Sequence, residues 1–202
     1  MNTLLEEVVG SEVEKRALEV ALSGGHSMVI YYNTGSFAPM LMGVGHRMAV
    51  EAGISFSGEA IPWCPCGNFG SHNKECTCTD QELKKKWGKL RKLKGGFAIW
   101  VGGTIPLTRE YTRHGELESV VMKRILAARE LKEPEDILDT YSRELVACFQ
   151  NSYSSGLDVE GVKAVARTIA RMDGQEKVQV QHVAEALQYQ PNSLLRLVEG
   201  WC

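Results

Sequence analysis

The residues best suited to chemistry are four cysteines that lie within fifteen positions of one another. Cys64 and Cys66 form one pair and Cys76 and Cys78 form the other, with a segment rich in glycine and asparagine between them. Four thiolates on a turn-rich loop are the ligand set of a tetrahedral structural zinc site. We therefore expect these cysteines to bind zinc, with His72 as an additional candidate ligand.

The spacing of the cysteines leaves two alternatives to a zinc site. Each pair has a single residue between its cysteines, whereas zinc knuckles commonly have two. The loop could therefore stay reduced and free of metal, or its cysteines could form disulfides. Because a reducing compartment disfavours disulfides, the sequence favours zinc first, a reduced loop second and disulfides last.

Composition limits the classes of protein to which the chain can belong. Its 202 residues are 44% hydrophobic and 24% charged, which is enough to bury a core without disulfides. No apolar run is long enough to cross a membrane, and the first residues are acidic where a secretory signal would be basic. We expect a soluble cytoplasmic protein with no membrane partner. The remaining cysteines, Cys148 and Cys202, are then expected to be a core residue and a terminal thiol.

The elements that must position the cysteine loop are strands and helices of the first half of the chain. Apolar residues at helical spacing predict a helix over residues 11–22, ended by the glycine pair at Gly24. Short apolar runs bounded by turn residues predict strands over residues 27–32 and 97–101. A second helix is expected over residues 40–51, between these two strands.

From Gly115 onward the apolar pattern is wholly helical. One stripe comprises Leu117, Val121, Ile125 and Ala128, a second helix is expected over residues 137–149, and a third contains Val162, Val165 and Ile169. The predicted fold is mainly helical α/β. Its α/β region (residues 1–114) contains the cysteine loop (64–78) and a basic helix (79–95), and a helical domain (115–202) follows.

The basic helix has an apolar side and a cationic side. Thr79 and Glu82 have the spacing of a capping box, and Leu83 and Trp87 lie on one side. The other side carries six candidate nucleic-acid-binding residues: Lys84, Lys85, Lys86, Lys89, Arg91 and Lys92. The net charge of −2 gives no global attraction to nucleic acid, so any binding to phosphates would be local to this helix. A solvated amphipathic helix is the alternative.

Several segments agree, in order, with one protein family. They are Gly24-Gly25-His26 before the first strand, the cysteine loop, residues 124–130 and residues 182–189. In these segments the chain resembles the ComM-type (YifB-like) branch of the magnesium chelatase-like AAA+ ATPases. The resemblance covers most of the chain. It implies a reduced AAA+-like α/β part, a C-terminal helical domain and a link to DNA processing.

The chain departs from this family at the residues that grip ATP. The family's phosphate loop ends in Gly-Lys-Thr, but the corresponding stretch here is Gly35, Ser36, Phe37, Ala38 and Pro39. Ala38 has no charge for the terminal phosphates, and Pro39 has no hydroxyl to hold magnesium. The family's acidic strand and its ATP-site arginines also lack counterparts. We therefore expect a catalytically inactive member that does not use ATP as a cofactor.

These observations predict a non-catalytic AAA+ remnant that acts as an interaction or regulatory module. Its expected partner is another protein, such as a full-length ATPase of the same family. A zinc-stabilised nucleic-acid-binding protein that binds DNA is one alternative. An ATP-binding, chelatase-like ATPase is the other, and it would need a phosphate-loop lysine that the sequence lacks.

Overall fold

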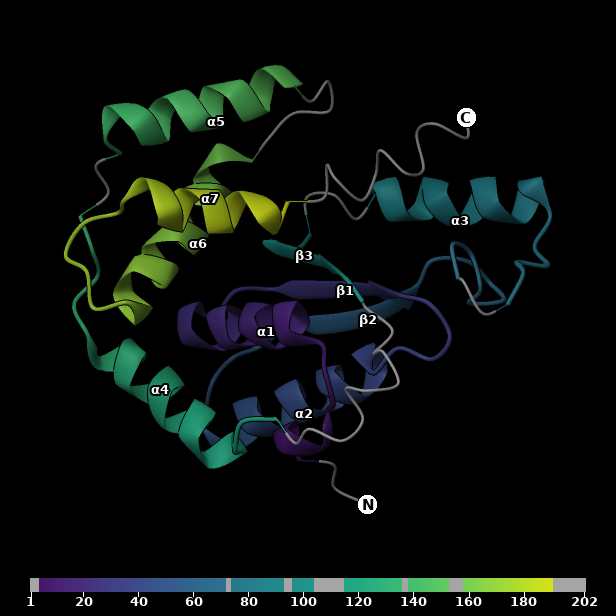
Figure 1. Ribbon diagram of the computed structural model, residues 1–202, viewed down its shortest axis with the longest axis horizontal. Helices are drawn as coiled ribbons and strands as arrows, with labels where there is room; N and C mark the ends of the chain where they lie inside the picture. The colour runs from purple at the N-terminus through teal and green to yellow at the C-terminus, as the bar shows by residue number, and fades with distance from the viewer. Residues whose placement is uncertain are drawn as a thin grey trace.

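The computed structural model describes residues 4–71, 74–92, 96–103, 115–135, 138–152 and 158–190. In this part the chain is mixed α/β and mostly helical. Its elements, in order, are the 3-10 helix η1 (Leu5–Glu7), α1 (Glu12–Gly24), β1 (Met28–Tyr32), α2 (Ala38–Glu51), β2 (Gly58–Pro62), α3 (Asp80–Lys92), β3 (Ile99–Gly102), α4 (Glu118–Glu130), α5 (Thr140–Ser152), α6 (Val159–Met172) and α7 (Val180–Gln188) (Figure 1).

The three strands form one parallel sheet in the order β2-β1-β3. Met28, at the start of β1, is opposite Gly58 of β2 and Ile99 of β3. The sequence predicted β1 and β3 but not β2. Glycine and proline bound β2, so its five residues carry little apolar pattern, and its pairing with β1 makes it a strand.

The outer edge of β2 offers few free backbone groups. Met28 N–H donates to Ser57 O at 2.9 Å and Trp63 N–H donates to Tyr32 O at 3.1 Å, so these flanking residues turn their backbone toward β1. Because backbone groups alternate along a strand, Gly58, Ala60 and Pro62 turn theirs outward. His46 donates to Gly58 O at 3.0 Å, and Pro62 has no N–H. The bonded carbonyl of Gly58 and the missing N–H of Pro62 therefore reduce the number of backbone groups with which another strand could pair.

The sheet separates two apolar cores. Met28 and Ile30 of β1 face the first core, which lies between the sheet and the helices α1 and α2. Val29 and Tyr31 face the second core. The second core is completed by Leu83 and Trp87 of α3, by Trp63 and Cys64 at the start of the cysteine loop, and by Trp100 of β3. Figure 1 shows α2 below the sheet and α3 above it.

Helix α1 lies between the sheet and the C-terminal helices, and it packs against β3, α2, α4 and α6. Five of its apolar residues are at most 2% exposed: Ala17, Leu18, Val20, Ala21 and Leu22. Gly25 ends the helix in a left-handed conformation (φ 67°) that favours glycine. The helix predicted over residues 11–22 is thus confirmed.

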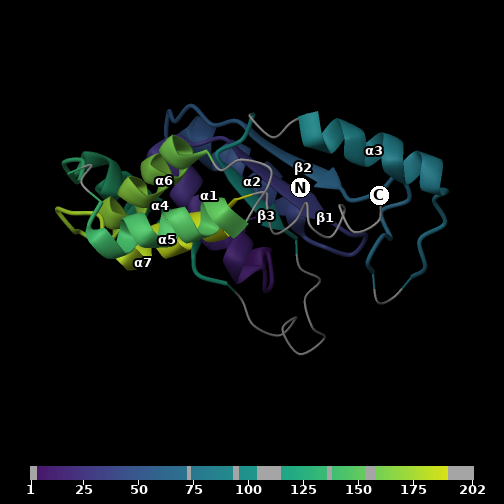
Figure 2. The ribbon, with the colours of Figure 1, turned by 90° about the horizontal axis from the view of Figure 1, so that it is seen from above.

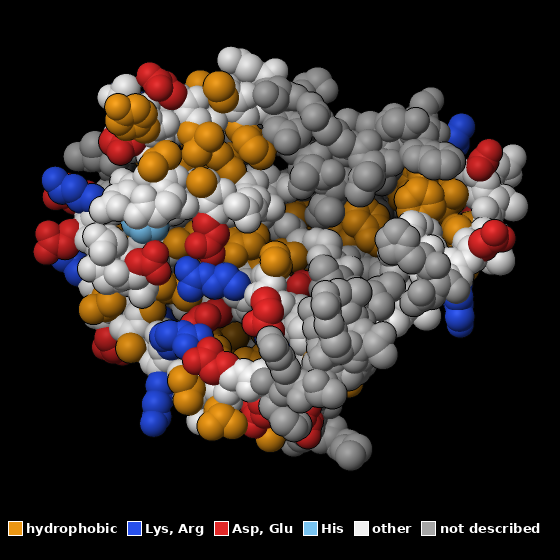
Figure 3. Space-filling view, viewed as in Figure 1, with side chains coloured by type: hydrophobic (Ala, Val, Ile, Leu, Met, Phe, Trp, Pro, Cys, Tyr) orange, Lys and Arg blue, Asp and Glu red, His pale blue; other side chains and the backbone are white. Residues whose placement is uncertain are grey.

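Ion pairs join α1 to the C-terminal helices. Arg16 Nε lies 2.9 Å from Glu185 Oε1 of α7, and Arg124 of α4 contacts Glu19 at 2.5 Å. Acidic and basic side chains lie next to one another over this junction (Figure 3). At the end of α1, Arg129 donates to Leu22 O at 3.0 Å. Arg171 satisfies the neighbouring carbonyl of Ser23 at 2.8 Å.

The C-terminal helices confirm the predicted helical stripes with one exception. Val162, Val165 and Ile169 of α6 are fully buried, and α7 packs on α6 and α5 (Figure 2). Leu117, however, is 57% exposed because it is the N-cap of α4 and precedes the buried positions of the helix, which begin at Val121.

Cys148 was expected to be a core residue, and this prediction is wrong. It is exposed on α5, whose buried positions include Ser142 and Val146. Those two residues lie four apart on the side of the helix that packs inward. Ile137 and Cys202 lie outside the described residues. No helix among the described residues has the length and apolarity needed to cross a bilayer.

His26 joins the start of the sheet to α6. Its Nε2 lies 2.8 Å from Thr168 Oγ1, and a Cβ atom at Gly24 would lie only 2.2 Å from the ring. Burial, helped by the positive charges of Arg171 and Arg167, lowers the pKa of His26 to about 4. His26 is therefore neutral in the folded chain at physiological pH.

We expect this histidine to make folding stability depend on pH. The pKa of His26 in the fold, about 4, is below its unfolded value of 6.5, so the unfolded chain takes up the proton first. Stability is therefore complete above about pH 6.5 and is lost as the pH falls toward 4. Between about pH 7 and pH 5 the loss should be about 2 kcal/mol in urea unfolding. His26→Gln should remove it, whereas His46→Gln, on the exposed face of α2, should not. Equal pH slopes in wild type and His26→Gln would contradict this assignment.

Candidate metal centre

The two cysteine pairs are held by regular structure at both ends of their loop. Cys64 lies two residues after β2, and Cys78 lies two residues before α3. Thr79 caps α3 as predicted: Glu82 N–H donates to Thr79 Oγ1 at 3.3 Å, and Thr79 N–H donates to Glu82 Oε2 at 2.9 Å. A strand and a capped helix thus bring the pairs together.

The four sulfur atoms have the separation that a tetrahedral metal requires. Cys66 Sγ lies 3.4 Å from Cys64 Sγ and 3.6 Å from Cys76 Sγ, and Cys64 and Cys76 are 3.7 Å apart. All four ligand atoms lie within 4.8 Å of one another. Sulfur atoms bound to one zinc ion at about 2.3 Å would be about 3.8 Å apart. The four cysteines could therefore hold a metal ion, and the geometry is compatible with zinc.

Backbone N–H groups surround the sulfur atoms. Phe69 N–H donates to Cys64 Sγ at 3.2 Å, and Cys66 N–H donates to Cys78 Sγ at 3.3 Å. Gly67, with φ 78°, reverses the chain between these ligands. Such donors stabilise thiolates, which are the form that binds a metal.

Cys66, Cys76 and Cys78 differ in how easily they lose a proton. Hydrogen bonds, the strongest from the backbone N–H of Asn68, lower the pKa of Cys66 to about 5. Burial raises the pKa of Cys78 to about 12, and it also raises the pKa of Cys76. Cys66 therefore ionises more readily than Cys76 and Cys78.

A cluster of aromatic side chains packs between the cysteines and the sheet. Phe69 packs edge-on against Trp87 of α3 at 4.8 Å between ring centroids, and Trp87 Nε1 donates to Trp63 O at 3.1 Å. Tyr31 of β1 lies 5.0 Å from Trp63 and 5.5 Å from Trp100. Cys64 is fully buried above this cluster, while the other three cysteines are partly exposed. The centre is therefore shielded on its sheet side and open on its outer side.

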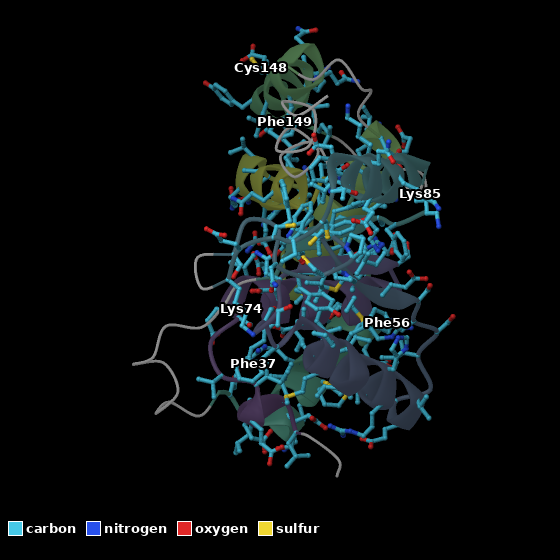
Figure 4. All side chains as sticks on the ribbon, turned by 90° about the vertical axis from the view of Figure 1, so that its right-hand side faces the viewer. Phe37, Phe56, Lys74, Lys85, Cys148 and Phe149 are labelled. Atoms are coloured by element: carbon cyan, nitrogen blue, oxygen red, sulfur yellow. The ribbon has the colours of Figure 1, made fainter. Side chains whose placement is uncertain are left out.

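The stretch that the sequence analysis compared with a phosphate loop, residues 35–39, spans the turn between β1 and the start of α2. Gly35 and Ser36 lie in the turn, Phe37 is the N-cap of α2, and Ala38 and Pro39 are its first residues. In Figure 4 the labelled Phe37 lies well apart from Lys85 of α3. This turn, which we call the β1–α2 turn (residues 33–37), contacts the cysteine loop through Thr34. Its N–H donates to Gly67 O at 2.7 Å.

The cationic side of α3 faces solvent. Lys84, Lys85 and Lys89 are exposed and Lys86 is partly buried, whereas Leu83 and Trp87 are buried as expected. A groove of about 270 Å³ lies between this helix and the cysteine loop, lined by Pro65, Glu82, Lys85, Lys86 and Lys89. His72 and the side chains of Arg91 and Lys92 lie outside the described part of the chain, as do residues 93–95 of the basic helix.

Sequence reasoning found the four cysteines but not the groups that position them. The backbone donors of Phe69 and Asn68 and the contact between Thr34 and Gly67 were missed. The one available signal was the glycine directly after Cys66, which indicated a tight turn but not its contact.

We expect Cys76→Ser to abolish stoichiometric metal binding, because three thiolates and an alcohol form a much weaker site. Elemental analysis after purification with Zn²⁺ should give about one ion per wild-type chain, and competition with a chelator should show at least a tenfold lower affinity for the variant. Cys148→Ser, on α5, is the matched control and should retain the ion. Full metal content in Cys76→Ser would rule out this ligand set.

Comparison with known proteins links the chain to one family. Residues 126–190, from within α4 to the end of α7, match the family model for the C-terminal domain of magnesium chelatase subunit ChlI. No curated protein matches the chain at a significant level. The matched segment contains α5, α6 and α7 and spans about a third of the chain. The C-terminal helices thus support a relationship between this chain and the magnesium chelatase-related family.

Proposed function

We propose that this chain is a non-hydrolysing, ComM-type relative of the magnesium chelatase-related AAA+ ATPases, in which a structural zinc ion stabilises a reduced α/β part. Its role is to bind a protein partner rather than to catalyse a reaction. The observation that carries this proposal is the β1–α2 turn, which stands where a phosphate loop would be.

Three backbone donors at this turn are used within the protein. A phosphate loop directs successive N–H groups at its ligand. Here Thr34 N–H donates to Gly67 O at 2.7 Å, Ser36 N–H to Asn33 O at 3.0 Å, and Ala38 N–H to Ser36 Oγ at 3.1 Å. Pro39 has no N–H. These groups cannot receive a phosphate without breaking bonds within the protein.

The sheet also lacks carboxylates where a nucleotide-bound magnesium ion would need them. In open parallel sheets, ligands bind beyond the carboxyl ends of the strands. Among the described residues, those ends are Tyr32 and Asn33, Pro62 and Trp63, and Gly102 and Gly103. None of these six is acidic. The geometry therefore supports the loss of both phosphate and magnesium binding.

The cysteine centre suits a structural ion. Four protein ligands fill a tetrahedral coordination shell and leave no position open for a substrate or a reactive water. The ion would join the end of β2 to the start of α3, which are the two elements that complete the second core. A metal here would stabilise the fold and take no part in a reaction.

Two features support a protein partner. The matched family model describes a domain of an enzyme subunit, which implies assembly for that protein. In this chain the corresponding helices are fixed to α1 by Arg16 and Arg124 and expose apolar side chains such as Leu126 and Tyr141. We infer that the C-terminal helices present a fixed surface to a full-length ATPase of the same family.

We expect no ATP binding by the purified, zinc-loaded chain. Calorimetric titration with ATP and Mg²⁺ should show no saturable heat at nucleotide concentrations up to about 1 mM, the upper end of the usual range of enzyme KM values. A full-length ATPase of the family, titrated under the same conditions, is the positive control. Saturable binding to this chain would overturn the proposal. The partner is tested separately by co-purification with that ATPase, and its absence from the bound fraction would count against it.

A nucleic-acid-binding role is the second candidate, favoured by the groove between the cysteine loop and the lysines of α3. Fluorescence anisotropy with a labelled single-stranded DNA should then show binding that weakens with salt. Changing Lys84, Lys85 and Lys86 together to glutamate should reduce affinity at least tenfold and flatten the salt dependence. The same reversal at Lys123, Lys132 and Lys177, which are exposed elsewhere, is the control. Equal effects in both triple variants would exclude this face of α3.

A further inference from the structure

The cysteine loop touches the β1–α2 turn at one closely fitted point. Thr34 N–H donates to Gly67 O at 2.7 Å. Gly67 has φ 78°, and a Cβ atom there would lie 2.4 Å from Thr34 Oγ1. Only glycine can adopt this conformation without strain and allow the turn to approach so closely. The contact therefore forms only when the β1–α2 turn and the cysteine loop are in the positions seen here.

The same short segment sets both the sulfur positions and the direction of Gly67 O. Gly67 N–H donates to Cys64 O at 3.1 Å, and two residues later Phe69 N–H donates to Cys64 Sγ at 3.2 Å. The N–H between them, that of Asn68, bonds to the Cys66 thiol. A metal that fixes Cys64 and Cys66 thus also fixes the carbonyl that holds Thr34.

The opposite side of the turn is fixed without the metal. A Cβ atom at Gly103, after β3, would lie 2.9 Å from Ser36 Oγ and 3.1 Å from Tyr31 O, so the turn is closely packed there. Thr34 and Gly35, in contrast, are exposed. The Thr34 end of the turn therefore depends on the cysteine loop for its position, whereas the Ser36 end does not.

The closed contact leaves two buried acceptors unsatisfied. Asn33 Oδ1, next to Thr34, and Asn68 Oδ1, next to Gly67, are buried and have no hydrogen-bond partner among the described residues. Unpaired buried oxygens disfavour the state that contains them. The closed state that contains them therefore needs stabilisation from elsewhere.

We propose that metal binding at the four cysteines switches the β1–α2 turn between a closed state, held by the Thr34–Gly67 contact, and an open state that frees the Thr34 end of the turn. The inference rests on the proposed metal site. Coupling of this kind is reciprocal, so the contact must raise metal affinity by the same factor by which the metal stabilises the contact. Thr34 and Gly67 are then positioning residues for the metal, although neither binds it.

Hydrogen exchange of the full chain tests the switch. In peptides covering residues 33–38, the amide of Thr34 should exchange at least tenfold faster after Zn²⁺ is removed with a chelator, while peptides from α6 should not change. The zinc content of each sample is measured in parallel. A chain that binds no zinc overturns the metal site and the switch together. A chain that binds one zinc ion but shows no change in this turn overturns the switch alone.

Two glycine variants separate the contact from the loop itself. Gly67→Ala should leave the turn in fast exchange even when zinc is bound, and it should lower zinc affinity at least tenfold. Gly70→Ala is the matched control, since Gly70 also has a positive φ (71°) but a Cβ atom there would meet nothing within 4 Å. It should keep the turn protected when zinc is bound. Equal turn exchange in the two zinc-loaded variants would contradict the role of Gly67. The comparison of wild type with and without zinc stands even if Gly67→Ala fails to fold.

Discussion

The burial of α1 from two sides is the constraint on which the rest of the structure depends. A helix that is covered by a sheet on one side and by other helices on the other must have its terminal carbonyls and charged groups satisfied by distant segments. Arg129 and Arg171 supply donors to its last carbonyls, and Glu185 and Arg124 pair with Arg16 and Glu19. The α/β part and the C-terminal helices therefore both contribute residues to the first apolar core.

A small sheet creates a second requirement, which the cysteine loop meets. Three strands expose two apolar faces, and α1 and α2 cover only one of them. Among the described residues, the other face is covered by α3 and by the aromatic cluster around Trp63 and Trp100. The four cysteines lie between β2 and α3, next to this cover. A metal ion held there would join β2 to α3 and would replace the packing that a larger sheet with more helices provides.

Much of this arrangement could be predicted from the sequence, because the informative patterns are local. The helical periodicity of α1 and α6, the apolar run of β1 and the capping box at Thr79 each depend on a few neighbouring residues. The short spacing of the cysteines likewise indicated that they lie together, and their sulfur atoms do.

The features that sequence analysis missed are determined by contacts between distant segments. β2 carries little apolar pattern and is defined by pairing with β1. The exposure of Leu117 and Cys148 depends on where α4 begins and which side of α5 meets α7. No local pattern links Thr34 to Gly67, because that contact joins residues more than thirty positions apart.

The outer edge of β2 has a consequence for how other molecules can approach. An open strand is usually the easiest place for a foreign chain to attach, since its backbone accepts any sequence. Here the imidazole of His46 occupies the carbonyl of Gly58 and Pro62 has no N–H to donate, so that, in the described part of the chain, Ala60 is the one outward residue of β2 that loses neither backbone group. A foreign strand added at this edge would therefore leave two of its own backbone groups without partners in β2. The β2 edge is thus a poor template for a new strand, which favours recognition on this side through side chains and helical surfaces.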